Sequence, residues 1–112
     1  KPARSIPFME NNPLEIVWLK HCVKDFKNLE DEEFIRADAK LKEALPNLIQ
    51  NTSRVEGTNL RRLRVGDKRL FLRIDGNNIL CVGYKTRGNA YNQKQLMEMD
   101  KIIQRIISGQ GL

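Results

Sequence analysis

The sequence is poor in the residues on which metal centres, disulfide frameworks and membrane spans depend. Its 112 residues include two cysteines and one histidine, and no stretch approaches the roughly 18 consecutive apolar residues that span a bilayer. Cys22 and Cys81 show neither metal-ligand spacing nor a C-x-x-C motif. We therefore expect no metal, no cofactor and no membrane span. The pattern is typical of reduced core cysteines in a cytoplasmic protein, although the sequence alone leaves a disulfide between them open.

The length and composition fit one compact domain. Hydrophobic residues make up 40% of the chain and charged residues 30%, which is an ordinary balance for a domain that buries a core without disulfides. We expect residues 14–112 to form this single domain and residues 1–13 to be a partly disordered N-terminal extension.

Hydrophobic periodicity predicts an α+β domain with the order β-α-α-β-β-β-α. Its first two helices should form a hairpin packed on one face of an antiparallel sheet, and the other helix should cover the same face. The wide apolar stripe of the last helix predicts core packing, or alternatively a surface that a partner chain covers. The elements are a strand at Leu14–Leu19, a short helix at Lys20–Leu29, a second helix from the acidic run Glu30–Glu33 to about Leu45, a meander at Thr58–Lys85 and a last helix at Asn92–Ser108.

Positive charge is concentrated in the middle of the chain. Residues 54–94 hold ten basic and three acidic side chains, whereas residues 1–53 hold eight basic and nine acidic ones. Such segregation indicates a surface for a polyanion more reliably than the net charge of +6 does.

The turns of the meander predict its register. Gly66-Asp67 is typical of a two-residue hairpin loop, which pairs Arg64 with Arg69. A three-residue loop at Gly76-Asn77-Asn78 then keeps the faces of the sheet consistent and pairs Arg69 with Lys85. We therefore expect Arg64, Arg69 and Lys85 side by side on three adjacent strands, and we call these three residues the cation row.

This register gives the sheet one apolar and one basic face. The apolar face, which should pack on the helices, carries Leu63, Val65, Leu70, Leu72, Ile74, Leu80 and Val82. The basic face carries Arg62, Arg64, Arg69, Arg73 and Lys85, with Phe71, Cys81 and Gly83 among them. Like charges opposite one another in a sheet repel, and we expect no acidic residue near the cation row. Phosphate would relieve this repulsion, because arginine offers a planar fork that fits it. The alternative is a solvated basic face that only keeps the protein soluble.

The meander also resembles a known family. The stretches LRRLRVGDKRLFLRID (60–75) and ILCVGYKTRGNAY (79–91) are similar to the RelE/ParE toxin superfamily. The shared features are the R-L-R-V-G-D-x-R block, a strand that ends in a basic residue and a tyrosine shortly after it, and the resemblance covers most of Leu14 to Ile107. It implies a RelE-like fold of the microbial ribonuclease type and the toxin of a type II toxin–antitoxin system.

For a RelE-like member, the resemblance implies metal-free cleavage of mRNA in the ribosomal A site, which inhibits translation. Arg69 then matches the arginine that stabilises the scissile phosphate, and Tyr91 matches a tyrosine that stacks on a base or transfers a proton. The candidates are Arg69, Lys85, Arg87 and Tyr91 for catalysis and Arg61, Arg62, Arg64 and Arg73 for RNA binding. The sequence departs from the family pattern at two places. Lys68 stands where the family usually has an aromatic residue. The segment after the strand reads Lys-Thr-Arg, so either Lys85 or Arg87 can be the key cation that follows the strand.

Metal-free cleavage needs a base for the 2′-hydroxyl proton, positive charge for the phosphorane and an acid for the 5′-oxygen. Fixed guanidinium groups meet the second need. His21 follows the first strand, away from the cation row, and is predicted to be a surface or capping residue. Proton transfer therefore falls to Tyr91, Lys85 or an arginine.

Two other functions are compatible with these residues. One is a ParE-like inhibitor of DNA gyrase, which is not an enzyme, and the other is a non-catalytic basic module that binds an antitoxin or nucleic acid. For the leading interpretation, the implied partners are an acidic antitoxin protein and mRNA on the ribosome, in the cytoplasm and without a membrane partner.

Overall fold

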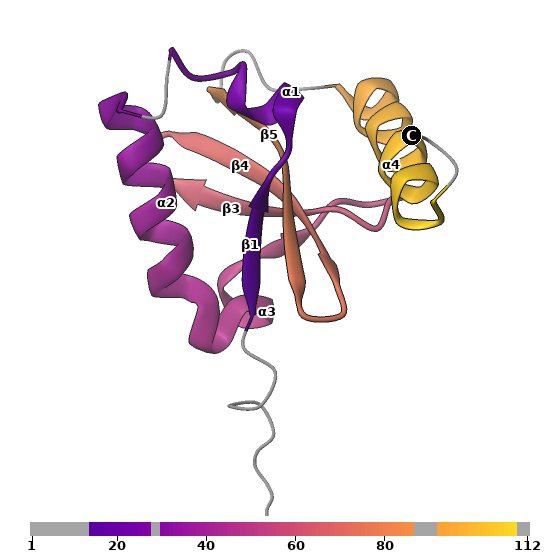
Figure 1. The fold of residues 1–112 in the computed structure, drawn as a ribbon, viewed down its shortest axis with the longest axis horizontal. Helices are drawn as coiled ribbons and strands as arrows, with labels where there is room; N and C mark the ends of the chain where they lie inside the picture. The colour runs from indigo at the N-terminus through magenta and orange to yellow at the C-terminus, as the bar shows by residue number, and fades with distance from the viewer. Residues whose placement is uncertain (1–13, 28–29, 87–91, 110–112) are drawn as a thin grey trace, which may run out of the picture.

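The predicted α+β class is confirmed by the computed structural model, which describes residues 14–27, 30–86 and 92–109 (Figure 1). The predicted extension at residues 1–13 lies outside the described residues. The elements in chain order are β1 (Glu15–Trp18), α1 (Lys20–Val23), α2 (Glu32–Ala44), the 3₁₀ turn η2 (Leu45–Asn47), α3 (Leu48–Asn51), β2 (Ser53–Arg54), β3 (Arg61–Val65), β4 (Lys68–Asp75), β5 (Asn78–Thr86) and α4 (Gln93–Ile107).

The strands form one five-stranded sheet in the order β1-β5-β4-β3-β2. Strands β3, β4 and β5 are the predicted antiparallel meander, and the short strand β2 extends it beside β3. Strand β1 differs, because it pairs with β5 in parallel. A parallel pair needs a long crossover connection, and the chain between β1 and β5 supplies one that includes α2.

The ends of the two long helices follow from their sequences. Asp31 caps α2 by accepting a hydrogen bond from the backbone N–H of Glu33 at 3.0 Å, and Pro46 falls in the 3₁₀ turn that ends the helix. Helix α4 begins with a capping box in which Asn92 and Gln95 satisfy each other's backbone N–H groups. The first and last residues of both helices agree with the predicted ones to within two residues.

The helices cover both faces of the sheet, so the expectation that they all pack on one face is wrong. Figure 1 shows α2 on one side of the sheet and α4 on the other. One core cluster joins Ala37 and Leu41 of α2 to the sheet, and a second joins Leu96 and Ile103 of α4 to it. Predicted core packing of α4 is thereby confirmed, and the basic face is only partly open to solvent.

The second turn of the meander is also different from the predicted one. Gly76 and Asn77 form a two-residue turn, which pairs Asp75 with Asn78. Gly76 has a φ of 60°, a conformation that glycine adopts without strain. The register then shifts by one residue at a β-bulge between Phe71 and Leu72.

The bulge changes which side chains face which helix. Leu80 and Val82 lie in the α4 cluster, not on the predicted apolar face, and Cys81 lies in the α2 cluster, not among the arginines. Beyond the bulge the register returns to the predicted one, and Arg69 pairs with Lys85.

Both cysteines are free and fully buried, which resolves the question of a disulfide. Burial raises the pKa of the Cys22 thiol to about 12, and it raises the pKa of Cys81 as well. The two thiols therefore stay protonated at neutral pH and act as small core side chains.

Candidate nucleic-acid interface

The cation row exists in the predicted register. Arg64 of β3 lies opposite Arg69 of β4, and Arg69 lies opposite Lys85 of β5. The three residues thus stand at one level of the sheet, at the end of the meander next to the Gly66-Asp67 turn.

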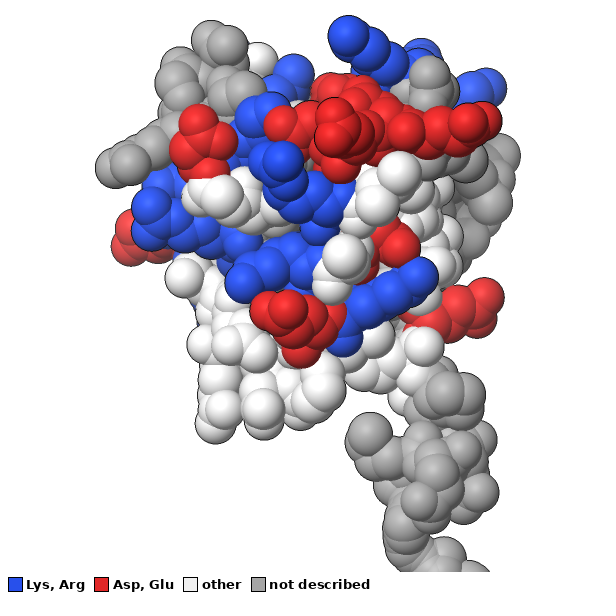
Figure 2. Space-filling model, turned by 90° about the vertical axis from the view of Figure 1, so that its left-hand side faces the viewer, with Lys and Arg blue, Asp and Glu red and all other residues white. Residues whose placement is uncertain are grey.

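Three arginines gather on one hollow of the surface. Arg62, Arg64 and Arg69 line a hollow of about 250 Å³ together with Asn51 and Ser53, and we call it the arginine hollow. Strand alternation explains the grouping: the neighbours of these arginines, such as Leu63 and Leu70, point into the α2 core. Figure 2 shows Lys and Arg side chains as a band across one side of the molecule, with most of the Asp and Glu side chains above it and others below and beside it.

Arg64 has a fixed orientation within this group. Its Nε donates a hydrogen bond to the carbonyl oxygen of Gly66 at 3.2 Å. The bond uses the inner edge of the guanidinium and leaves the two terminal nitrogens as donors for an anion. The turn that sets the register therefore also orients one of the cations.

Lys85 has an acidic neighbour, which contradicts the expectation of no acid near the row. Its Nζ lies 3.6 Å from Oδ1 of Asp25, and Oδ2 of Asp25 accepts a hydrogen bond from the backbone N–H of Tyr84 at 2.8 Å. Strand β1 ends at Trp18, opposite Cys81, and beyond that point α1 lies beside β5. The segment that follows α1 supplies Asp25 to this edge.

A polar cluster beside Lys85 ties α2 to the sheet. Glu33 forms an ion pair with Lys68 and accepts a hydrogen bond from the Tyr84 hydroxyl at 2.9 Å. The bond from Lys68 lowers the pKa of Glu33. Burial, and next the bond to Glu33, raises the pKa of Tyr84, which therefore stays a neutral donor. Glu33, Lys68 and Tyr84 line a second hollow, of about 330 Å³. Asp25 and Lys85 also line it.

Two predicted RNA-binding residues have internal partners. Arg61 donates hydrogen bonds to Oγ1 of Thr52 at 2.6 Å and to the carbonyl oxygen of Ile49 at 3.0 Å. Arg73 reaches α4, where Nη1 lies 3.5 Å from Oδ1 of Asp100. Neither residue lines the arginine hollow. These contacts tie Arg61 to the end of α3 and Arg73 to α4, and RNA binding by either residue stays a prediction.

Two predicted catalytic residues, Arg87 and Tyr91, lie outside the described residues, as does the side chain of His21. Within the described part of the chain, no group of three or more His, Cys, Asp or Glu side chains is placed to hold a metal ion. No helix in the same ranges is long and apolar enough to cross a membrane.

The residues that sequence reasoning missed come from segments with no local signal. Asn51 and Ser53 fall in a stretch that reads as a polar loop, yet it forms the end of α3 and strand β2. Asp25 and Glu33 are 60 and 52 positions before Lys85 in the chain. Tyr84 stands in an apolar run and reads as a core residue, and its buried ring does join the α2 core.

Comparison with known proteins identifies the fold. No protein-family model and no curated protein matches the chain. A chain of the toxin–antitoxin complex RelBE2 from Mycobacterium tuberculosis is 17% identical at a TM-score of 0.52, over 67% of this chain and 99% of that one. A chain of the RelB–RelE antitoxin–toxin complex from Methanococcus jannaschii is 23% identical at a TM-score of 0.50, over 64% and 91%. The chain therefore has a RelE-like toxin fold.

Proposed function

We propose that this chain is the toxin of a type II toxin–antitoxin system and that it cleaves mRNA on the ribosome without a metal ion. The observation that carries the proposal is the convergence of Arg62, Arg64 and Arg69 on one hollow of a RelE-like fold. Among the residues that the structure describes, none of those lining the hollow is acidic, so the hollow suits an anion such as a phosphate group.

Arg69 has the central part in the proposed reaction. The 2′-oxygen attacks phosphorus and forms a new P–O bond, the phosphorane carries an extra negative charge, and the bond to the 5′-oxygen breaks to leave a cyclic phosphate and a 5′-hydroxyl. Arg69 lies between Arg64 and Lys85 in the sheet, where its guanidinium can stabilise the developing charge while Arg62 and Arg64 hold the adjoining phosphates.

The proton transfers fall to residues at the end of β5 and beyond it. We assign to Lys85, whose Nζ lies 3.6 Å from Oδ1 of Asp25, the transfer of a proton to the 5′-oxygen that leaves. Arg87 and Tyr91 enter by the family resemblance alone, Arg87 as an alternative to Lys85 and Tyr91 as the group that takes the 2′-hydroxyl proton or stacks on a base.

The proposed protein partner is an acidic antitoxin. We propose that the toxin acts in the cytoplasm. The two structures compared above are complexes of a toxin with its antitoxin. The net charge of +6 and its concentration in the middle of the chain favour a partner of opposite sign.

The test is to express the chain and map the 5′ ends of mRNA by primer extension, beside a gyrase cleavage assay. We expect cuts at ribosome-bound codons. Arg69→Ala should lower their rate by roughly 100-fold, the usual cost of losing one donor to a developing anion, and Arg69→Lys should recover part of it. Arg105→Ala, an exposed change on α4, is the matched control.

Other outcomes would refute the proposal. DNA breaks that depend on gyrase would indicate a ParE-like inhibitor. If neither mRNA cuts nor DNA breaks are found, the chain is a non-catalytic binding module. Normal cleavage by Arg69→Ala would exclude the role given to the arginine hollow.

A further inference from the structure

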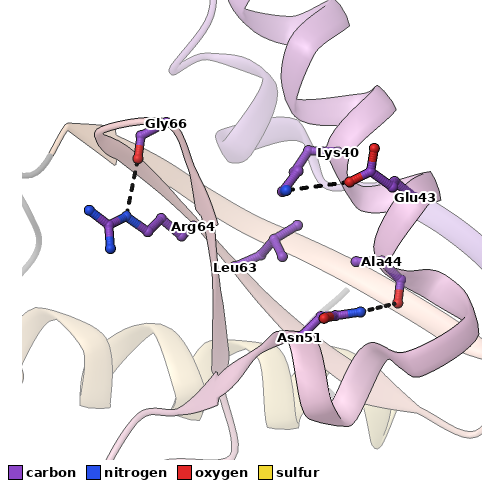
Figure 3. Close-up of a pocket in the computed structure, with 7 residues that line it drawn as sticks. All are labelled: Lys40, Glu43, Ala44, Asn51, Leu63, Arg64 and Gly66. Atoms are coloured by element: carbon purple, nitrogen blue, oxygen red, sulfur yellow. Dashed lines mark hydrogen bonds and ion pairs between the residues drawn. The ribbon is translucent and has the colours of Figure 1, made fainter.

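Another hollow lies between α2 and β3 and shares Arg64 with the arginine hollow. It has a volume of about 330 Å³, within the range of roughly 300–1,000 Å³ usual for small-ligand sites. We call it the α2–β3 hollow. Figure 3 shows its lining residues, which are Lys40, Glu43, Ala44, Asn51, Leu63, Arg64 and Gly66.

The two hollows adjoin one another. Arg64 and Asn51 line both of them. The Arg64 guanidinium points toward Gly66, away from Lys40 and Glu43 (Figure 3). A ligand with a phosphate in the arginine hollow can therefore reach the α2–β3 hollow past Asn51.

The lining of the α2–β3 hollow differs from that of its neighbour. Leu63 and Ala44 are 2% and 4% exposed and give it an apolar base. Glu43 supplies a carboxylate, and Asn51 supplies an amide whose Nδ2 donates to the carbonyl oxygen of Ala44 at 3.4 Å, which leaves its Oδ1 to accept from a ligand. Acceptors at the rim of an apolar space suit a flat ring with N–H groups on its edge.

The carboxylate of Glu43 can exchange its present partner for a ligand. Its bond to Lys40 is 3.4 Å long and joins side chains that are 75% and 47% exposed. Exposed pairs of this kind contribute little to stability. A ligand that donates two N–H groups would replace this contact at little cost.

We propose that the α2–β3 hollow binds a nucleobase next to the phosphate in the arginine hollow, and that Glu43 selects guanine. This inference rests on the proposed function, since it extends the same RNA site. Guanine presents two adjacent donors, N1–H and N2–H, that match a carboxylate, whereas uracil presents a single N–H.

The test measures binding of the purified full chain to the trinucleotides UpGpU and UpUpU by isothermal titration calorimetry. We expect wild-type protein to bind UpGpU roughly tenfold more tightly, a usual discrimination for one paired base edge. The Glu43→Gln variant should bind both trinucleotides with the affinity that the wild-type protein has for UpUpU. Glu32→Gln, the same change at an exposed position of α2, should keep the preference. Circular dichroism verifies the fold of each variant.

The outcomes separate this inference from the proposed function. Equal binding of both trinucleotides by wild type, or a preference that survives Glu43→Gln, would overturn the base site and leave phosphate binding intact. Absence of binding to either trinucleotide would overturn both. Weaker binding of both trinucleotides by Arg62→Ala, with the preference kept, would support the assignment of phosphate and base to separate hollows.

Discussion

At the scale of single residues, Asp25 is the unexpected neighbour of the cation row. Its carboxylate joins Lys85 and the backbone of Tyr84 and so sets a negative charge beside a surface meant for phosphate. We expect Asp25→Asn to bind single-stranded RNA roughly threefold more tightly at low salt, since one repulsive charge is removed while the amide oxygen still accepts from Tyr84. The gain should shrink at high salt.

A matched control for this charge change is Glu15→Gln. Glu15 is exposed and pairs with Asn78, at the opposite end of β5 from Lys85. Titration of labelled RNA should show no gain for this variant. An equal gain for both variants would mean that net charge alone governs binding and that Asp25 has no local effect.

Glu33 gives the molecule a pH-dependent stability. Its pKa is lowered in the folded chain, chiefly by the bond from Lys68, so the stabilisation is present at neutral pH and is lost as pH falls through the folded pKa, below about 4.3, the ordinary value for Glu. We expect urea unfolding to show a steeper loss of stability between pH 6 and pH 3 for wild type than for Glu33→Gln. Parallel curves would contradict this role.

Tyr84 contributes to the same cluster through its hydroxyl. Removal of a hydrogen bond to a charged acceptor usually costs about 1–3 kcal/mol, and the bond to Glu33 is 2.9 Å long. We therefore expect Tyr84→Phe to lower the free energy of unfolding by about 1–2 kcal/mol at pH 7. In Glu33→Gln the same change should cost less, because the charged acceptor is already gone.

At the scale of elements, Arg73 fastens α4 to the sheet. Its side chain and that of Asp100 are only 14% and 17% exposed, and Nη2 donates to Oε1 of Gln104 at 2.8 Å. Loss of one member of a largely buried pair leaves the other charge without compensation. We expect Arg73→Ala to cost about 3 kcal/mol in unfolding free energy and to speed amide hydrogen exchange in α4.

A double change distinguishes the ion pair from simple packing. Arg73→Met with Asp100→Leu should recover most of the loss, because apolar replacements of a buried pair are often neutral. Unchanged exchange in α4 after Arg73→Ala would show that the helix is held by its apolar stripe alone.

The elements also show where sequence reasoning reaches its limit. The first hairpin was predictable because Gly66-Asp67 is a strong turn signal and Arg64 and Arg69 flank it evenly. The second was not, because Ile79 to Val82 is apolar throughout. A strand buried on both faces has no alternation from which to read its orientation, and the bulge at Phe71 and Leu72 leaves no mark in an apolar run.

At the scale of the whole molecule, the arginine hollow and Lys85 should set the salt dependence of RNA binding. Three or four phosphate contacts imply a slope of about −2 to −3 in a plot of log K against log salt for a single strand. We expect fluorescence anisotropy with a short RNA to give this slope, and Arg62→Ala to reduce it by about 0.7. A slope of zero would exclude phosphate contacts, and a much steeper one would mean that basic residues elsewhere also bind.

The site itself was predictable only in part. Local strand pairing placed the cation row correctly, because its three members lie within one meander. The acidic side chains around it, such as Asp25 and Glu43, come from the segment after α1 and from α2, and only the crossover between β1 and β5 brings them near. Sequence patterns describe what a segment does locally, and they carry no signal for contacts of this range.

The Gly76-Asn77 turn lies at the far end of β4 from the cation row, six residues along a strand that rises about 3.4 Å per residue. Asn77 is exposed, and both native thiols are buried. A cysteine introduced by Asn77→Cys would therefore react selectively with a maleimide dye or a surface linker. The protein could then be attached to a surface, or followed in single-molecule fluorescence, through a label on this turn. The label would lie away from the cation row and leave it accessible to RNA.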